Sequence, residues 1–356
     1  MRFALVGCGR IAAKHAEIMR EGAGLGTRLV GVCDIVEARA TAFAQRYGVQ
    51  PFTDMHEMMS RLGPEVDVVN VLTPSGMHAH HCIALAPYGK HIVVEKPMAL
   101  TMADAEAMIA ACERADVRLF VVKQNRYNLP VVKLREALVA GRFGQLVLGT
   151  VRVRWSRDQK YYDQDLWRGT WALDGGVFAN QASHHIDLLV WMLGDVESVI
   201  ARTAHALADI EAEDTGAAIV RFKSGALGII EATTATRPRD LEGSISILGA
   251  GGSVEIGGFA VNEMKTWRFA TAAPGDEAVL DTFRENPRTV YGFGHRAYFE
   301  DVVDAVRSGR PALVEGREGR KSLEVICAIY ESAASGNEVR MGFVQKHSRL
   351  GRGQEG

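Results

Sequence analysis

The sequence predicts an α/β protein built from two domains, and a change of pattern along the chain carries that prediction. In residues 1–122, short apolar segments alternate with helical segments, the pattern of βαβ units and of a doubly wound parallel sheet. In residues 123–345, period-two alternation between glycine-containing turns predicts an α+β domain with a large, mostly antiparallel open sheet. Residues 346–356 are polar and glycine-rich, and we expect a disordered tail there.

The strands of the first domain are predicted from apolar runs that would be buried on both faces, as the strands of a parallel sheet are. These runs occupy residues 3–6, 29–33, 66–72, 91–95 and 119–122. Helical segments lie between them, at residues 11–21, 36–47, 78–88 and 102–115. In the last of these segments, small and apolar residues recur three and four positions apart, which is the helical period.

The strands of the second domain alternate apolar and polar residues, as expected for a sheet with one covered face. They are predicted at residues 147–155, 217–222, 226–233, 244–248 and 253–256. Phe-Lys-Ser-Gly at residues 222–225 is typical of a hairpin turn that joins two of them. Helices are predicted at residues 130–140, 178–192, 294–308 and 319–335.

The 356-residue chain has the composition of an ordinary globular protein, with 47% hydrophobic and 24% charged residues. Its net charge of −2 gives no sign of a nucleic-acid partner. No apolar run approaches the roughly 18 residues that a membrane span needs, and the N-terminus enters a strand directly instead of resembling a signal peptide. Five scattered cysteines without a Cys-x-x-Cys pair favour reduced thiols and a cytoplasmic location.

A dinucleotide-binding turn is predicted at residues 7–12, where Gly-Cys-Gly-Arg-Ile-Ala follows the first strand and opens a helix. Gly7 and Gly9 would let the backbone approach a pyrophosphate, and the helix N-terminus offers it free amides. Asp34 ends the second strand, where a carboxylate accepts the ribose hydroxyls and repels a 2′-phosphate, so NAD is favoured over NADP. The pattern therefore predicts a Rossmann domain that binds NAD; the alternative is a glycine turn that binds no nucleotide.

Lys96 stands where a lysine is unusual, directly after the apolar run 91–95. An ammonium at the carboxyl end of a parallel strand points into the crevice where open α/β sheets bind ligands. Burial lowers the pKa of a lysine, so a lysine kept in such a place usually has a partner or a task. Pro97 fixes the backbone just past the charge. The alternative is a lysine whose ammonium reaches solvent from the strand end.

A polar cluster is predicted on the helix expected at residues 178–192, where Asn180, His184 and Asp187 share one face. Oxidation of an alcohol by NAD needs a base for the hydroxyl proton, and histidine suits that task near neutral pH. We therefore expect His184 to be the base and Lys96 to stabilise the alkoxide; the alternative is a solvent-facing polar stripe. The histidines at residues 78–81 wrap around a helix and cannot converge on one ion, so no metal is expected.

Together, the glycine turn, Thr73-Pro74 before a helix, Glu95-Lys96-Pro97 and the Gly-Gly…His-x-Ile-Asp segment resemble the Gfo/Idh/MocA oxidoreductases over almost the whole chain. The resemblance implies that Lys96 and His184 are catalytic, and that the chain forms a homo-oligomer, a dimer or tetramer, through its open sheet. It also implies a Lys96–Pro97 bond of a kind that is often cis. We expect NAD to be bound by Gly7, Gly9, Arg10, Ile11, Asp34, Thr73, Pro74, His78, Glu95, Lys96 and Gln124.

Within that family, residues 122–128, 161–164, 167–171 and 180–181 are similar to the UDP-N-acetyl-2-amino-2-deoxyglucuronate 3-dehydrogenases. This resemblance implies NAD-dependent oxidation of the C3′ hydroxyl of the UDP-sugar in lipopolysaccharide O-antigen biosynthesis, with 2-oxoglutarate re-oxidising NADH in some members. The substrate contacts that it implies come from Lys96, Tyr162, Arg168, Asn180, Gln181, His184, Arg237 and Arg239. Most of the family has an aspartate where this chain has Asn180, so Glu95 and the substrate carboxylate are candidates for tuning Lys96.

Two other interpretations stay open. A dehydrogenase of the same family that acts on a free sugar or on inositol would need no nucleotide on its substrate. A non-catalytic NAD-binding sensor would keep the fold without the chemistry, although the presence of both Lys96 and His184 argues against it.

Overall fold

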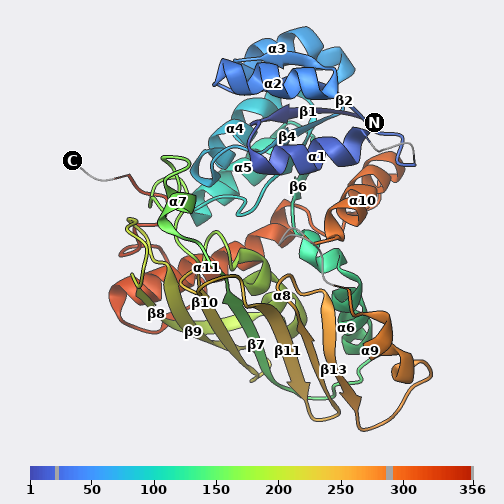
Figure 1. Ribbon diagram of the computed structural model, residues 1–356, viewed down its shortest axis with the longest axis vertical. Coiled ribbons are helices and arrows are strands. Elements are labelled where there is room, and N and C mark those ends of the chain that lie inside the picture. The colour runs from blue at the N-terminus through green and yellow to red at the C-terminus, as the bar shows by residue number, and fades with distance from the viewer. Residues whose placement is uncertain (21–23, 286–291, 354–356) are drawn as a thin grey trace. The chain divides into compact units, whose positions relative to one another are not determined.

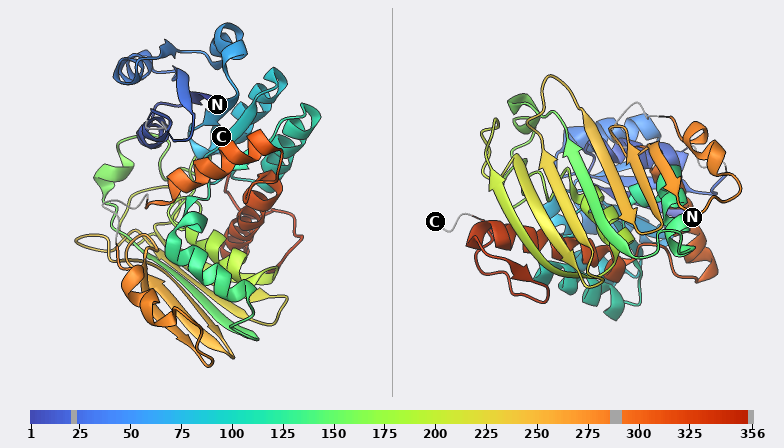
Figure 2. Two further views of the ribbon diagram at one scale, coloured as in Figure 1. Left: turned by 90° about the vertical axis from the view of Figure 1, so that its right-hand side faces the viewer. Right: turned by 90° about the horizontal axis from the view of Figure 1, so that it is seen from below.

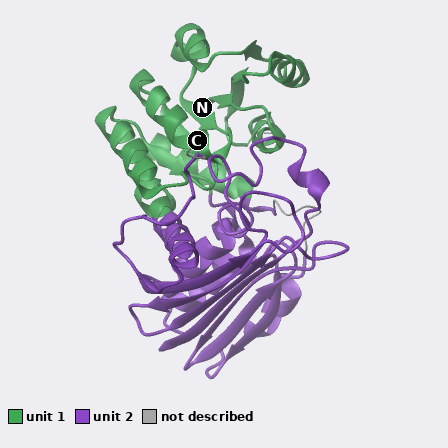
Figure 3. Ribbon diagram, turned by 90° about the vertical axis from the view of Figure 1, so that its left-hand side faces the viewer, with its two compact units in different colours: residues 1–122, 295–320 green, residues 123–294, 321–356 purple. Residues whose placement is uncertain are grey.

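The computed structural model describes residues 1–20, 24–285 and 292–353, and the chain divides into two compact units (Figure 3). Unit 1 comprises Met1–Val122 and His295–Arg320, and unit 2 comprises Lys123–Gly294 and Lys321–Gly356. Residues 295–320 therefore belong with the first unit, whereas the sequence places them in the second domain. The reason is packing: the ring of Phe299 meets the edge of Phe3 at 5.9 Å, and Arg118 donates to the Ala305 carbonyl.

Unit 1 contains a six-stranded sheet in which every pair of neighbouring strands is parallel, as predicted (Figure 1). Its order is β3 (Gln50–Phe52), β2 (Arg28–Cys33), β1 (Arg2–Val6), β4 (Val68–Val71), β5 (His91–Val94) and β6 (Leu119–Val121). The sequence analysis missed β3, a three-residue edge strand that contains Pro51. Proline is tolerated there because an edge strand has one row of amides that pairs with no neighbour.

The helices of unit 1 lie close to those predicted, except one helix, over residues 55–62, that was not predicted from the sequence. They are α1 (Arg10–Arg20), α2 (Glu37–Tyr47), α3 (Met55–Leu62), α4 (His78–Leu85), α5 (Met102–Arg114) and α10 (Gly294–Ser308), with the 3-10 turns η1 (Gly63–Glu65), η2 (Ser75–Met77) and η3 (Ala86–Tyr88). Residue 21, the last of the first predicted helix, lies outside the described residues. The Thr101 side chain accepts a hydrogen bond from the Asp104 amide and caps α5, which fixes where that helix begins.

Unit 2 contains an eight-stranded sheet that is antiparallel except where β10 pairs with β7. Its order is β13 (Glu263–Phe269), β12 (Gly252–Gly257), β11 (Glu242–Gly249), β7 (Leu146–Arg154), β10 (Leu227–Thr233), β9 (Thr215–Phe222), β8 (Val196–Ala204) and β14 (Val339–Arg340). The right-hand view of Figure 2 shows this sheet with its outer face toward the viewer and helices of the same unit behind it. The predicted mostly antiparallel open sheet is confirmed.

The helices of unit 2 include the one that carries His184. They are α6 (Leu129–Val139), α7 (Gln159–Tyr162), α8 (Ser183–Leu193) and α9 (Val279–Thr282), with η4 (Gln124–Tyr127) and η5 (Asp276–Ala278); α11 (Gly316–Ser335) has its first residues in unit 1 and the rest in unit 2. A Cβ atom on Gly149 would come within 2.8 Å of the Leu189 and Leu193 side chains, so glycine in β7 lets α8 lie close to the sheet.

Two predictions for unit 2 are wrong. The helix expected at residues 178–192 begins only at Ser183, because residues 175–182 form turns that other parts of the chain hold in place. The tail expected to be disordered is ordered over residues 346–353, where Leu350 is fully buried; residues 354–356 lie outside the described part. In the described ranges, no helix is both long enough and apolar enough to span a bilayer.

Candidate active site

The glycine turn of unit 1 has the shape that a dinucleotide needs. Gly7 has φ +101°, and a Cβ atom there would lie 2.7 Å from the Leu72 carbonyl oxygen, so only glycine fits. At Gly9 an added Cβ would meet no described atom within 4 Å, which leaves the backbone open to a ligand. Helix α1 begins at the next residue, Arg10, and presents its first amides beside the turn. These features fit a pyrophosphate.

Asp34 ties the end of β2 to the glycine turn. Its Oδ2 accepts the Cys8 amide at 2.9 Å, and its Oδ1 accepts the Val36 amide at 2.9 Å. Each carboxylate oxygen has a second lone pair, so the same group can accept ribose hydroxyls. Burial raises the pKa of the Cys8 and Cys33 thiols to about 12, so neither is a nucleophile near neutral pH.

His78 lies at the start of α4, where the sequence predicts a cofactor contact, and it is only 1% exposed. Its Nδ1 is 2.8 Å from the Pro97 carbonyl, and its Nε2 is 2.8 Å from the Thr73 carbonyl. Burial lowers its pKa, so the imidazole is neutral and donates to one of the two carbonyls at a time. The side chain therefore joins the loop after β4 to the loop after Lys96.

Glu95 is a buried carboxylate with a partner on each oxygen. Its Oε1 lies 3.0 Å from His15 Nε2, and its Oε2 accepts the Lys96 amide at 3.1 Å. His15 is held in turn by Asn70, whose amide nitrogen lies 3.0 Å from Nδ1. Burial raises the pKa of Glu95, but the hydrogen bond from His15 and the positive charges nearby outweigh burial and hold it at about 2. Glu95 is therefore an anion at neutral pH.

Lys96 is half-buried and lies two residues beyond the end of β5, and the Lys96–Pro97 peptide is cis. The Lys96 amide donates to the Glu95 carboxylate, and this hydrogen bond helps to position the lysine. His15, Asn70 and His295 surround Glu95, and neither His15 nor Asn70 was predicted from the sequence as part of the site. The available signal was polarity: histidine and asparagine stand among apolar residues of α1 and β4. Although His15, Glu95 and His295 are metal-binding residue types, both ring nitrogens of His15 already contact protein groups.

In unit 2, His184 lies in the first turn of α8 and is 7% exposed. Its Nε2 is 2.9 Å from Nε2 of Gln124. With the amide in this orientation, its NH2 group donates and His184 Nε2 is the acceptor. An imidazole nitrogen that accepts a hydrogen bond is the kind of atom that a general base needs. Gln124, predicted from the sequence to contact the cofactor, thus also contacts His184 through its amide nitrogen.

Asp187, one turn along α8, is an anchor. Its carboxylate accepts bidentate hydrogen bonds from Arg126, with Nε 2.7 Å from Oδ2 and Nη2 2.9 Å from Oδ1. Lys123 Nζ lies 3.6 Å from Oδ1, and it also donates to Ser322 at 2.9 Å. Burial raises the pKa of Asp187, but the charges of Arg126 and Lys123 outweigh burial and lower it. The ion pair fixes α8, and the sequence analysis found neither cation as a partner.

Asn180 stands outside the helix, in the turns before α8. Its Nδ2 donates to Asp174 Oδ1 at 2.5 Å, and Asp174 Oδ2 accepts the Gly169 amide at 2.8 Å. The expectation that Asn180 shares a helix face with His184 is therefore wrong. Gln181 follows it and is 5% exposed. An aspartate, Asp174, is thus present beside the position where the family usually has one.

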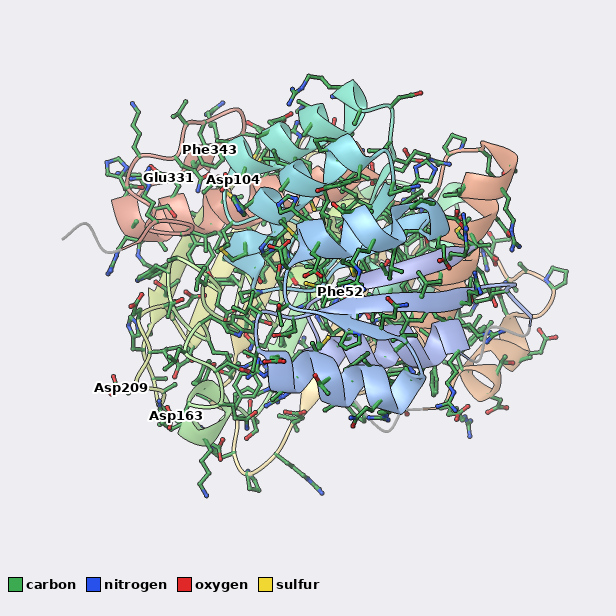
Figure 4. All side chains as sticks on the ribbon, turned by 90° about the horizontal axis from the view of Figure 1, so that it is seen from above. Phe52, Asp104, Asp163, Asp209, Glu331 and Phe343 are labelled. Carbon is green, nitrogen blue, oxygen red and sulfur yellow. The ribbon has the colours of Figure 1, made fainter. Side chains whose placement is uncertain are left out.

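Arg168 and Tyr162 line a hollow of about 400 Å³ in unit 2. Arg168 donates from Nε to Asp165 at 3.1 Å and from Nη1 to the Tyr161 hydroxyl at 2.9 Å. Tyr162 shares a hydrogen bond of 2.9 Å with Thr234. Figure 4 labels two acids of the rim, and the full lining is Gln159, Tyr162, Asp163, Asp165, Leu166, Arg168, Thr170, Asp209, Ile210 and Glu211. The predicted arginine is therefore already held by an acid.

Arg237 and Arg239 are exposed on the segment that follows β10. The Arg237 guanidinium donates to the backbone carbonyls of Thr234 at 3.0 Å and of Arg157 at 3.1 Å. These contacts hold Arg237 against its own loop. The hydrogen bonds of Arg237 described here go to Thr234 and Arg157 and not to His184 or Asn180.

The fold, together with the glycine turn and Asp34, defines an NAD-binding oxidoreductase with a separate α/β domain. The chain matches the description "Oxidoreductase family, NAD-binding Rossmann fold" over residues 1–123 and "Oxidoreductase family, C-terminal alpha/beta domain" over residues 135–341. It belongs to the Gfo/Idh/MocA family, which confirms the resemblance and NAD as the cofactor.

Two solved structures are similar to the chain. One is the WlbA dehydrogenase from Bordetella pertussis in complex with NADH and UDP-GlcNAcA, with 42% identity, 96% of this chain and 99% of that chain covered, and a TM-score of 0.89. The other is the WlbA dehydrogenase from Chromobacterium violaceum with the same ligands, with 43% identity, 97% and 96% covered, and a TM-score of 0.90. Among curated proteins, the myo-inositol 2-dehydrogenase of Thermotoga maritima is 29% identical over 96% of this chain and 98% of its own length.

Proposed function

We propose that this dehydrogenase oxidises the C3′ hydroxyl of UDP-N-acetyl-2-amino-2-deoxyglucuronate to a ketone, as a step in O-antigen sugar biosynthesis. The observation that carries the proposal is the likeness at 42–43% identity to two dehydrogenases that were crystallised with UDP-GlcNAcA. The inositol dehydrogenase, at 29%, is a more distant relative over the same length. The likeness includes both the unit with the glycine turn and the unit with His184.

Two side chains would carry the proton chemistry. His184 would accept the hydroxyl proton on Nε2, the atom that the Gln124 amide now contacts at 2.9 Å. The buried Asp187–Arg126 pair keeps the helix of His184 in place. The Lys96 ammonium would stabilise the alkoxide as it forms. NAD, when bound, supplies the hydride acceptor.

The substrate's other groups call for donors and acceptors of several kinds. The carboxylate and the diphosphate favour arginine. Arg168 is the first candidate, because it lines the hollow and its hydrogen bonds to Asp165 and Tyr161 use Nε and Nη1 rather than Nη2. Arg237 and Arg239 are further candidates. Asn180, Gln181 and Tyr162 would contact hydroxyls or the acetamido group, since amides and phenols both donate and accept.

Three further expectations complete the proposal. The chain would act as a dimer or tetramer in the cytoplasm, and its NADH would be re-oxidised by 2-oxoglutarate. The outer face of the eight-stranded sheet supports association, because Ile219 is 53% exposed and Ile229 is 40% exposed on neighbouring strands. All five cysteines are free thiols, which suits a reducing compartment.

The test is a turnover assay on the intact chain with NAD and one sugar at a time: UDP-N-acetylglucosaminuronate, the same uronate without UDP, and myo-inositol. We expect NADH or, with 2-oxoglutarate added, 2-hydroxyglutarate, together with a 3-keto product, from the UDP-sugar alone. Equal turnover of the nucleotide-free uronate or of inositol would favour the alternative dehydrogenase. Tight NAD binding without turnover of any of the three would favour a sensor.

A further inference from the structure

Residues 346–352, here called the C-terminal strap, form an ordered segment whose role no other feature explains. The strap lies beyond residue 341, where the match to the family ends. Figure 4 labels Phe343, which precedes the strap, and Glu331 on α11, where the strap is anchored. The strap also closes on itself, because the Arg352 guanidinium donates to the carbonyls of Gln345 and Lys346.

Glu331 holds the beginning of the strap. Its carboxylate accepts the backbone amides of Lys346, His347 and Ser348, each at 3.0 Å, and lies 2.7 Å from His347 Nδ1. Burial raises the pKa of Glu331, but these donors outweigh burial and lower it. A carboxylate that receives three amides in a row fixes the direction of the chain, so the strap leaves α11 along a defined path.

The end of the strap covers the segment at residues 171–175. Leu350 is fully buried, and a Cβ atom on Gly175 would lie 2.7 Å from its Cδ1, so the leucine fills the space that a glycine leaves open. The Gly351 amide donates to the Trp171 carbonyl at 2.9 Å. The Arg349 guanidinium lies 5.5 Å from the centre of the Trp171 ring. Apolar, hydrogen-bond and cation–π contacts therefore converge on one short loop.

Tyr330, the neighbour of Glu331 on α11, holds the next part of the same loop. Its hydroxyl accepts the amides of Gly176 at 2.9 Å and of Ala179 at 3.2 Å, and it donates to Glu213 at 2.8 Å. Its ring meets the edge of Trp171 at 5.7 Å. The two adjacent residues of α11 thus act on the loop together, Tyr330 directly and Glu331 through the strap.

The loop leads directly into the residues that the proposed reaction uses. The Ala182 amide donates to the Val177 carbonyl at 2.8 Å, and the Ile186 amide donates to the Ala182 carbonyl at 2.9 Å. If residues 171–177 moved, these hydrogen bonds would also displace Asn180, Gln181 and the first turn of α8, where His184 lies.

We propose that the C-terminal strap is a positioning element, which holds residues 171–182 so that Asn180, Gln181 and His184 stand ready for substrate. This proposal rests on the function proposed above only for its kinetic readout. The partners of the strap described above, Glu331 and Trp171, both lie in unit 2, whereas the glycine turn lies in unit 1, so we expect the strap to set turnover and not the affinity for NAD.

The first experiment compares the intact chain with a variant that ends at Phe343. Hydrogen exchange would be followed by mass spectrometry with NAD present, because that readout needs no substrate. We expect faster exchange confined to residues 171–182, an unchanged Kd for NAD, and a kcat on the UDP-sugar that falls roughly tenfold or more, since a misplacement of about 1 Å can cost about a hundredfold. Adding a synthetic peptide of residues 344–356 should restore both exchange protection and kcat.

The second experiment compares two apolar truncations in the same segment. Leu350→Ala removes a side chain that is fully buried, whereas Val344→Ala removes one that is 72% exposed. We expect Leu350→Ala to reproduce the loss in kcat with KM for NAD unchanged, and Val344→Ala to behave as the intact chain. A peptide carrying Leu350→Ala should fail to rescue the shortened variant.

Three results would overturn the proposal: full kcat in the shortened variant, exchange that rises evenly over the unit, or no rescue by the unaltered peptide. Failure of the proposed function looks different, because the intact chain itself would then produce neither NADH nor a keto sugar. In that case the exchange and peptide measurements still decide whether the strap holds the loop.

Discussion

The substitution Asp187→Asn should strongly destabilise unit 2, because it breaks a buried ion pair without changing the shape of the side chain. Asp187 is 1% exposed and Arg126 is 1% exposed, and Lys123 at 2% shares the same carboxylate. Asparagine would leave two buried cations without their anion. Removal of one partner of a buried ion pair costs about 3–5 kcal/mol. For a unit of roughly 200 residues, that loss lowers the Tm by about 6–20 °C.

The assay is urea and thermal unfolding, followed by circular dichroism and by calorimetry to separate the transitions of the two units. Asp195→Asn is the matched control, since Asp195 is 72% exposed and lies 3.8 Å from an exposed Lys223. Surface pairs contribute less than about 1 kcal/mol, so the control should unfold like the original chain. If Asp187→Asn also cost less than about 1 kcal/mol, the ion pair would not be what anchors α8, and the reasoning about His184 would lose its support.

Three other predictions concern different parts of the chain. Gly7→Ala should weaken NAD binding at least tenfold by titration calorimetry, because its Cβ would meet the Leu72 carbonyl at 2.7 Å with φ +101°; an unchanged Kd would show that the turn does not hold the cofactor. Lys96→Ala should lower kcat roughly a hundredfold or more, and stopped-flow NADH formation at the original rate would remove Lys96 from the chemistry. Burial raises the pKa of Glu213 from 4.5 to about 7, so its contribution to stability is full below pH 4.5 and is lost as pH rises through about 7. Glu213→Gln should therefore flatten the fall in unfolding free energy over that pH range, and an unaltered slope would show that Glu213 titrates normally.

The sequence was sufficient where the signal is local. Each strand of the parallel sheet except β3 lies in a mostly apolar segment, and the glycine turn, Asp34 and Lys96 stand within two residues of a strand end. Composition and spacing carry this information within a few residues. That is why the fold and the cofactor could be predicted from the residues themselves, while the family was predicted from the resemblance of the motifs.

The sequence was insufficient where a residue's conformation depends on distant partners. Residues 175–182 contain an apolar pattern that favours a helix, but their backbone amides donate to distant side chains instead. The Gly176 amide donates to the Tyr330 hydroxyl, 154 positions along the chain, and the Phe178 amide donates to Glu213, 35 positions along the chain. The strap has the composition of a disordered tail, yet two contacts keep it ordered. Its amides donate to Glu331, and its Leu350 side chain packs against Gly175. Period and composition cannot report such contacts, because they arise only when the chain has folded.

The positions of Lys96 and His184 also depend on contacts with residues that are distant in the sequence. Neither side chain depends on its sequence neighbours alone: Glu95 contacts the Lys96 amide but is itself held by His15, and Gln124 contacts His184 while Arg126 anchors the helix below it. A residue of another element thus supports each candidate catalytic group, His15 of α1 through Glu95 and Gln124 of η4 directly. Since buried polar contacts are costly when they are incomplete, a substitution in either support should change the reacting group that it holds. The kinetic effect of His15→Ala on Lys96 chemistry would then resemble a positioning defect, with kcat lowered and the pyrophosphate turn intact.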